Sequence, residues 1–285
     1  MGRNITAMAT DPEDRLVAAE VGDWAEDKYL HVEHYARMFA RAMKGKWDCR
    51  VYLELFSGPG RANLEGTDRI LDTAPLRALG LDPGFDLHVY GELDGERLRA
   101  LETRCRRRHP AARCAFIQGD VNATWPELLR YVQENARGGT YLTFCFVDPY
   151  KCSDLAFSTL RGLSDLYVDF LVLIPSFMDA NRNCERYLEP GNEILDRFLG
   201  DRDWRDAWVA RGETREKFGL FVADQFGLRM KRLGFLYDGS VDMKLIRSTD
   251  KNLPLYHLAF FSRHELGPKL WRGAKESSDP QRKLF

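Results

Sequence analysis

Two glycines after an apolar run are the first residues in this sequence whose types and spacing indicate chemistry. Residues 51–60 read VYLELFSGPG, so the run ends at Gly58 and Gly60. The apolar side chains predict a strand buried on both faces of a parallel sheet, and glycines let a ligand approach the backbone closely. In doubly wound folds, such a turn presents backbone N–H groups to a nucleotide cofactor. Because the full G-x-G-x-x-G pattern is absent, these residues alone fit a turn without a ligand equally well.

Acidic residues stand at the ends of the next three apolar runs. The runs span residues 87–93, 114–118 and 141–147, and the acids are Glu92, Asp120 and Asp148. The carboxyl ends of parallel strands meet at one edge of a sheet, so these side chains should gather beside the glycine turn. An acid in the place of Glu92 accepts hydrogen bonds from ribose hydroxyls, and one in the place of Asp120 reaches an adenine amino group. Asp120 is an equally good cap for a helix over residues 125–135, and Asp148 could also cap a helix.

The segments between these runs predict the elements that position the candidate residues. Apolar residues at helical spacing predict a helix over residues 24–43, with Lys28 and His31 on its solvated face. A further helix is expected from Pro75 and another over residues 95–108. Later elements are expected as a strand at 168–174, helices at 192–199, 204–210 and 214–233, and a hairpin of strands within 235–246 and 253–261.

Three segments show no regular pattern. Residues 1–20 are expected to be a flexible lead-in with a short helical piece, and residues 266–285 a polar tail. The polar stretch 61–73 is expected to be a long loop, either one that covers a ligand or a flexible insertion. The chain then divides into an N-terminal extension (1–48), an α/β domain (49–265) with a helical insertion at about 177–233, and the tail.

The composition limits the classes of function. The chain has 285 residues, of which 44% are hydrophobic and 30% charged, as in soluble globular proteins. Its formal net charge of -1 excludes an overall basic field for non-specific nucleic-acid binding. A local cluster of Arg104, Arg106, Arg107, Arg108 and His109 fits either solvated cations at a helix C-terminus or a patch for nucleic-acid phosphates.

The cysteines and the apolar runs indicate a cytoplasmic protein without a metal site or a membrane segment. The six cysteines form no C-x-x-C pair and have no metal-ligand spacing, so we expect buried, reduced thiols. The most apolar run, residues 166–175, is too short to span a bilayer and contains Asp169.

Five predicted parallel strands followed by an antiparallel pair match the architecture of class I S-adenosylmethionine-dependent methyltransferases. Within this class, the chain resembles the three-Cys-motif partner (TcmP) family. The resemblance covers nearly the whole chain, from Gly22-Asp23-Trp24 through YLELFSGPGR, GEL, GDVN and FVDPY to LYHLAFFSRHELG. It implies a Rossmann-like methyltransferase fold, S-adenosylmethionine as cofactor, and a partner protein that carries the three-cysteine motif. The scattered cysteines of this chain are not that motif.

The resemblance also implies roles for individual residues. Carried over by position, the cofactor-binding residues are Phe56, Gly58, Gly60, Glu92 and Asp120. The two glycines would line the methionine part of the cofactor, Glu92 would hold the ribose hydroxyls, and Asp120 would hold the adenine.

Asp148-Pro149-Tyr150 resembles the [DN]-P-P-[YF] motif of methyltransferases that act on exocyclic amino groups of adenine or cytosine. There the acid accepts a hydrogen bond from the amino group, whose lone pair attacks the sulfonium methyl group, and the aromatic ring stacks on the base. This sequence lacks the second proline and continues with Lys151. Asp148 and Tyr150 are therefore candidate catalytic residues, and Pro149, Lys151 and Arg182 are candidate substrate-binding residues.

Two functions of different classes fit these observations. The first is an S-adenosylmethionine-dependent methyltransferase that acts on a nucleobase amino group in DNA or RNA by direct in-line transfer. The second is a partner subunit of a three-Cys-motif protein, with or without bound cofactor and without methyl transfer. Near-neutral charge and the missing proline favour the subunit, whereas the clustered polar strand ends favour the enzyme. A nicotinamide-dependent oxidoreductase is a weaker alternative, because the third glycine is absent.

Overall fold

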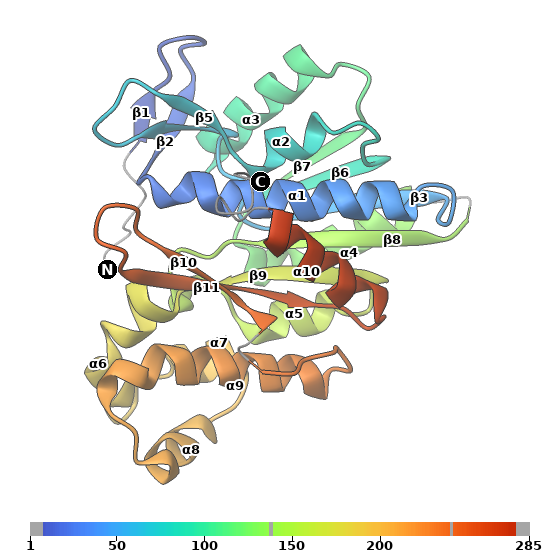
Figure 1. Ribbon diagram of the computed structural model, residues 1–285. Helices are drawn as coiled ribbons and strands as arrows, with labels where there is room; N and C mark the ends of the chain where they lie inside the picture. The colour runs from blue at the N-terminus through green and yellow to red at the C-terminus, as the bar shows by residue number, and fades with distance from the viewer. Residues whose placement is uncertain (1–7, 137–138, 240–241, 278–285) are drawn as a thin grey trace.

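The computed structural model describes residues 8–136, 139–239 and 242–277, which form two β-sheets and their covering helices (Figure 1). The larger sheet has seven strands in the order β10-β11-β9-β8-β3-β6-β7. Its strands are β3 (Cys49–Glu54), β6 (Leu87–Glu92), β7 (Cys114–Gln118), β8 (Tyr141–Val147), β9 (Val168–Ile174), β10 (Lys244–Arg247) and β11 (Pro254–Phe261). The first five of these are parallel, and β11 is antiparallel to both of its neighbours. The α/β class and the mostly parallel sheet are confirmed.

The strand order reverses beside β3. From β3 the chain adds β6 and β7 on one side and then crosses over to add β8 and β9 on the other side. In open α/β sheets, ligands bind at such a reversal, outside the carboxyl ends of the strands. A ligand site is therefore expected at the carboxyl ends of β3 and β8.

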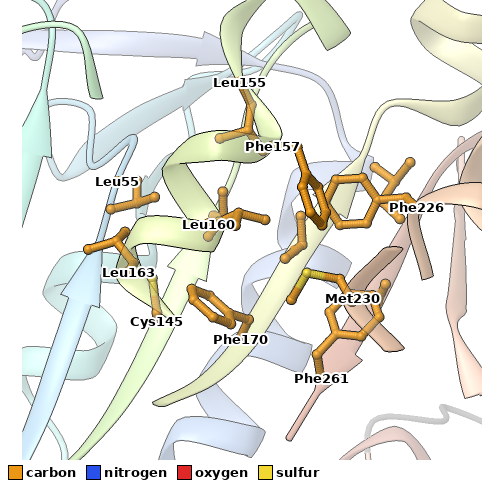
Figure 2. Close-up of a cluster of buried hydrophobic side chains, with 14 of the residues drawn as sticks. Leu55, Cys145, Leu155, Phe157, Leu160, Leu163, Phe170, Phe226, Met230 and Phe261 are labelled. Carbon is orange, nitrogen blue, oxygen red and sulfur yellow. The ribbon is translucent and has the colours of Figure 1, made fainter. Parts of the chain in front are cut away.

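Helices cover both faces of the large sheet. One face carries α1 (Trp24–Met43), α2 (Ala74–Leu79), α3 (Gly95–Arg108) and α10 (Leu266–Ser277). The other carries α4 (Val121–Asn135), α5 (Phe157–Leu163), α6 (Cys184–Leu188), α7 (Ile194–Leu199), α8 (Trp204–Arg211) and α9 (Phe218–Arg232). Short helical turns are η1 (Cys152–Asp154), η2 (Ser176–Asn181) and η3 (Arg215–Lys217). Figure 2 shows the second core, where Phe157 of α5 lies beside Phe226 of α9, with ring centroids 5.7 Å apart.

The smaller sheet corrects two predictions. It has the order β1-β2-β4-β5, built from β1 (Met8–Thr10), β2 (Val17–Val21), β4 (Arg61–Leu64) and β5 (Ile70–Asp72). Residues 61–73 are thus a hairpin added to the N-terminal strands, not a loop over a ligand, and residues 8–21 are not a helical lead-in. The strands are so short that their apolar alternation could not be recognised, and β2 pairs with a remote segment. Residues 1–7 of the predicted lead-in lie outside the described residues.

Arg104 joins the small sheet to α3. Its guanidinium donates to the Asp14 carboxylate at 2.7 and 2.9 Å and to the carbonyl oxygens of Val17 and Pro59 at 2.8 and 2.7 Å, and it lies 3.3 Å from Asp11. Only 2% of its side chain is exposed. The basic cluster is therefore not uniformly solvated, because its first arginine is a buried structural group.

We expect Arg104→Met to lower the free energy of unfolding by about 3–5 kcal/mol, because it leaves the fully buried Asp11 carboxylate with one cation fewer. The matched control is Arg106→Met. Arg106 is 74% exposed and pairs with Glu102 one turn away, so its loss should cost less than about 0.5 kcal/mol. Urea unfolding of both variants measures the difference. Equal effects would mean that the Arg104 contacts contribute no more than a surface pair.

The C-terminal segment corrects a further prediction. Residues 266–277 form α10, which packs on α1 and buries Trp271 and Ala274. The polar residues of the segment obscured this apolar helical spacing. Residues 278–285 lie outside the described residues. Among the described residues of the predicted strand 235–246, those at the end alone form a strand, β10. In the described part of the chain, no helix is long and apolar enough to cross a membrane.

Candidate functional site

Glu92 and the glycine turn after β3 form one hydrogen-bonded unit. The Glu92 carboxylate accepts a hydrogen bond from the Gly58 N–H at 2.8 Å and another from the Asp94 N–H at 2.9 Å. Asp94 in turn caps α3 as expected, since it accepts from Glu96 and Arg97. The structure thus fixes the ends of β3 and β6 together. Glu92 is buried, and its expected contact with a ribose stays a prediction.

The two glycines of the turn serve different purposes. Both have positive φ, +61° at Gly58 and +87° at Gly60. A Cβ at Gly60 would lie 2.8 Å from Leu101 Cδ1 and 3.1 Å from Leu76, so this glycine is needed where α2 and α3 pack on the turn. A Cβ at Gly58 would meet nothing within 4 Å. Gly58 therefore borders open space, whereas the preceding Phe56 packs partly against the core.

Asp120 caps α4, which is one of the two roles that the sequence allowed for it. Its carboxylate accepts from the backbone and side-chain nitrogens of Asn122, both at 2.9 Å, and α4 begins at Val121 rather than at Trp125. The Asn122 amide also donates to Asp154 and accepts from Ala156. It thereby ties the loop after β7 to the segment after β8. Asp120 is exposed, and its contact with an adenine remains a prediction.

A buried ion pair occupies the end of β8. Lys28 Nζ lies 2.6 Å from Asp148 Oδ2, and their side chains are 11% and 16% exposed. Burial by itself lowers the pKa of Lys28, but the Asp148 carboxylate more than offsets this, so the pKa of Lys28 is raised. The predicted solvated face of α1 is wrong at Lys28, and also at His31, whose buried Nδ1 lies 2.8 Å from the Asp27 carbonyl oxygen.

Further polar groups lie around this ion pair. The Lys28 ammonium is 4.7 Å from the centroid of the Tyr29 ring. The Tyr256 hydroxyl, from β11, interacts with the charges of Lys28 and Asp148 and has no hydrogen-bond partner among the described residues. A buried polar group without a partner calls for an explanation, and one explanation is a ligand. Tyr256 thus brings an unpaired hydroxyl to the Asp148 side of the site.

Glu54, the last residue of β3, is a buried carboxyl group in the same region. Burial raises the pKa of Glu54 well above its usual value, and the charges of Asp148 and Glu92 add to the rise. The hydrogen bond that it accepts from the Tyr52 hydroxyl at 2.7 Å acts in the opposite direction. The edge of the sheet thus holds three carboxyl groups close enough to interact, with Lys28 as their buried cation.

Asp179 of η2 fixes the segment that follows Asp148. Its carboxylate accepts from the Cys152 N–H at 2.7 Å and from the Tyr187 hydroxyl at 2.7 Å. Pro149 is buried, Tyr150 is 50% exposed, and Lys151 Nζ lies 5.8 Å from the Tyr150 ring centroid. The aromatic ring therefore stands at the surface beside the acid, where a flat ligand could stack on it.

Arg182 is a predicted site residue whose place is less well defined. It follows η2 and is exposed, and its carbonyl oxygen accepts from Arg215. Among the described residues, no hydrogen bond or ion pair joins its side chain to Asp148. Its role in substrate binding stays a prediction.

Three residues of this cluster were not predicted as site residues from the sequence: Lys28, Glu54 and Tyr256. Lys28 stands on the apolar stripe of α1, four positions before Val32, and a lysine on such a stripe is a signal for a buried partner. Glu54 lies in a fully buried strand just before the glycine turn. Because a glutamate is rarely buried without a partner, its position in such a strand is a signal for a site residue. For Tyr256 the sequence contains no such signal.

The described residues contain no group of three or more histidine, cysteine or acidic side chains that could hold a metal ion. The six cysteines are free thiols.

Comparisons with known proteins give only distant similarity. Neither a protein-family model nor a curated protein matches the chain. Among solved structures, similarity extends to Trm1 from Pyrococcus horikoshii with S-adenosyl-L-methionine, with 8% identity and a TM-score of 0.44 over 85% of this chain and 57% of that one. It also extends to magnesium protoporphyrin IX methyltransferase from Synechocystis PCC 6803 with bound SAH, with 10% identity and a TM-score of 0.39 over 83% and 86% of the two chains. At this level of similarity we draw no conclusion about function from either protein.

Proposed function

We propose that the protein is an S-adenosylmethionine-dependent methyltransferase whose acceptor is an amino group of a nucleobase in DNA or RNA. One observation carries the proposal. The open Gly58 turn, fastened by Glu92, and the acid Asp148 end neighbouring strands at the point where the strand order reverses. A cofactor site and an acceptor site are thus expected side by side.

The residues at the turn fit the proposed cofactor. Gly58 leaves room at the backbone, and Ser57 has a buried hydroxyl without a partner among the described residues. Glu92 would accept from ribose hydroxyls through the remaining lone pairs of its carboxylate. When bound, S-adenosylmethionine supplies a sulfonium methyl group that an amino nitrogen can attack.

Asp148 and Lys28 would act on the acceptor. The Lys28 ammonium holds Oδ2 of Asp148 and stabilises the carboxylate, which leaves Oδ1 to accept a hydrogen bond from the acceptor amino group. This hydrogen bond orients the nitrogen lone pair and favours loss of the amino proton as the new bond forms. Tyr150 would stack on an unpaired base, which positions it at the acid.

Transfer of a labelled methyl group from S-adenosylmethionine to single-stranded DNA and RNA oligonucleotides tests the proposal. The wild type should label strands that contain adenine or cytosine. Asp148→Asn should lower the rate by about 10²–10⁴-fold, because the amide accepts a proton poorly. Equal labelling by both proteins would show that Asp148 takes no part in the mechanism. Absence of labelling by the wild type would contradict the proposed methyltransferase activity.

The alternative is a cofactor-binding subunit of a three-Cys-motif protein that transfers no methyl group. The observation in its favour is that Lys28 already neutralises Asp148. This alternative predicts that S-adenosylmethionine binds to the purified chain without any labelling of nucleic acid, and that a three-Cys-motif protein co-purifies with it.

Substitution of the two glycines separates cofactor binding from packing. Gly60→Ala should lower the free energy of unfolding by about 1–3 kcal/mol, because the new methyl group collides with Leu101. Gly58→Ala costs about 1–2 kcal/mol for its backbone conformation and should in addition weaken binding of S-adenosylmethionine. Urea unfolding and calorimetric titration measure the two effects. Unchanged affinity in Gly58→Ala would show that the open space is not the cofactor site.

A further inference from the structure

A second chemically distinctive region lies at the opposite edge of the large sheet. A cavity of about 370 Å³ opens at the amino ends of β6 and β7, beside the end of α3. Leu87 and Cys114, the first residues of these strands, line it together with Cys105 of α3. Since Glu92 and Asp120 lie at the other ends of the strands, the cavity is separate from the proposed methyltransferase site.

Two thiols of this cavity come from neighbouring elements. Cys105 is buried, Cys114 is partly exposed, and both line the cavity, where the two groups interact. Each of the two elements is firmly placed: Cys114 begins a strand in register with His88 of β6, and Cys105 lies in the last turns of α3, which packs on β7. Both cysteines therefore stand where α3 and β7 pack together, beside one cavity.

The lining of the cavity favours a reactive thiolate at Cys114. The hydrogen bond from Cys105 lowers the pKa of Cys114, burial acts in the opposite direction, and the charge of Arg106 lowers it further. His109 and Arg113 also line the cavity. Reactive cysteines in proteins occupy partly exposed, electropositive surroundings of this kind, whereas structural buried cysteines are inert.

We propose that Cys114 and Cys105 are a reversible redox site, at which a peroxide oxidises the two thiols to a disulfide. The Cys114 thiolate attacks one oxygen of the peroxide, the O–O bond breaks, and hydroxide leaves and becomes water on protonation. Cys114 is then a sulfenic acid. The Cys105 sulfur attacks the Cys114 sulfur, the S–O bond breaks, and the hydroxide that leaves takes the Cys105 proton as a second water. The two thiols lose two electrons in total, and hydrogen peroxide gains them.

The division of roles follows from exposure. Both thiols line the cavity, but Cys114 is partly exposed and is therefore the one that a small oxidant reaches first, whereas Cys105 is buried. The disulfide would fasten the end of α3 to the start of β7. The other four thiols are all buried, and none of them lines this cavity; they are Cys49, Cys145, Cys152 and Cys184.

The test treats the reduced, folded wild-type protein with one equivalent of hydrogen peroxide and maps its cysteines by peptide mass spectrometry. We expect loss of two of the six free thiols, one disulfide joining Cys105 to Cys114, and full recovery of the thiols with dithiothreitol. In Cys105→Ser, Cys114 should stop at the sulfenic acid and be trapped by dimedone. In Cys114→Ser, Cys105 should stay reduced. Cys152→Ser is the matched control and should form the same disulfide as the wild type.

Other outcomes would overturn the proposal. These are a disulfide between any other pair, oxidation of Cys114 to the sulfinic acid in the wild type without a disulfide, or no loss of thiols. The wild-type measurement decides the matter even if a serine variant fails to fold. The result does not depend on the proposed methyltransferase activity, because the readout is the state of the cysteines.

Discussion

Lys28→Met is expected to lower the free energy of unfolding by about 3–5 kcal/mol, because it leaves the Asp148 carboxylate unpaired in a largely buried position. The double variant Lys28→Met/Asp148→Leu should be markedly more stable than Lys28→Met alone. Removing both charges removes the desolvated group that the single substitution leaves behind. A double-mutant cycle by urea unfolding measures the coupling between the two residues.

The matched control is an exposed ion pair on the same helix. Arg69 lies 2.8 Å from Glu26 of α1, and the two side chains are 58% and 45% exposed. Arg69→Met should change stability by less than about 1 kcal/mol. If Lys28→Met cost no more than Arg69→Met, then water would screen the Lys28–Asp148 pair, and the buried character assigned to the site would be wrong.

The pH dependence of this coupling follows from the raised pKa of Lys28. A cation whose pKa is raised on folding contributes its full stabilisation below the pKa of the unfolded chain, 10.5 for lysine. The contribution is lost only as the pH rises from there through the still higher pKa of the folded state. Loss of the Lys28 proton should therefore not change the coupling between Lys28 and Asp148 across the neutral range. It should weaken the coupling only in strongly alkaline solution.

The large sheet could be predicted from the sequence because its central strands are buried on both faces. β3, β8 and β9 are mainly apolar segments, which can be recognised without knowledge of their neighbours. The long helix α1 was likewise predicted from its apolar stripe, with its bounds correct. In each case the side chains of one local segment carry the whole signal.

The small sheet could not be predicted in this way, because remote partners stabilise it. The β2 strand is held beside β4 by pairing, and the acids between β1 and β2 are held by Arg61 and Arg104. No local pattern in residues 8–21 reveals those arginines. The 61–73 stretch was wrongly interpreted as a loop for the same reason, since its polar residues pair with charges far away in the sequence.

The candidate site was predicted only in the part that follows from strand ends. Glu92, Asp148 and the glycine turn do meet at one edge, as the parallel arrangement requires. Lys28 could not be placed there without the tertiary structure, because its partner is 120 residues away. Arg182 was chosen for its charge alone; it is exposed after η2, and its role in substrate binding stays a prediction.

Glu92→Ala is expected to weaken S-adenosylmethionine binding by about 10–100-fold, the loss of one or two hydrogen bonds to a charged group. The substitution would remove the proposed contact with the ribose. It would also release the Gly58 N–H, which now points into the carboxylate, so the turn would lose the bond that holds its shape. Calorimetric titration with S-adenosylmethionine and S-adenosylhomocysteine measures the effect, with NAD as the competing ligand.

Asp94→Ala is the control that distinguishes the effect of the Glu92 carboxylate on cofactor binding from an effect of a less stable α3. Asp94 caps the same helix, and its side chain can be removed while its backbone N–H still donates to Glu92. We expect this variant to lose about 0.5–2 kcal/mol of stability but to bind the cofactor like the wild type. Equal loss of affinity in both variants would mean that α3 as a whole, rather than the Glu92 carboxylate, controls the site. If the wild type bound neither adenosyl ligand, both the proposed cofactor and the proposed methyltransferase activity would be wrong.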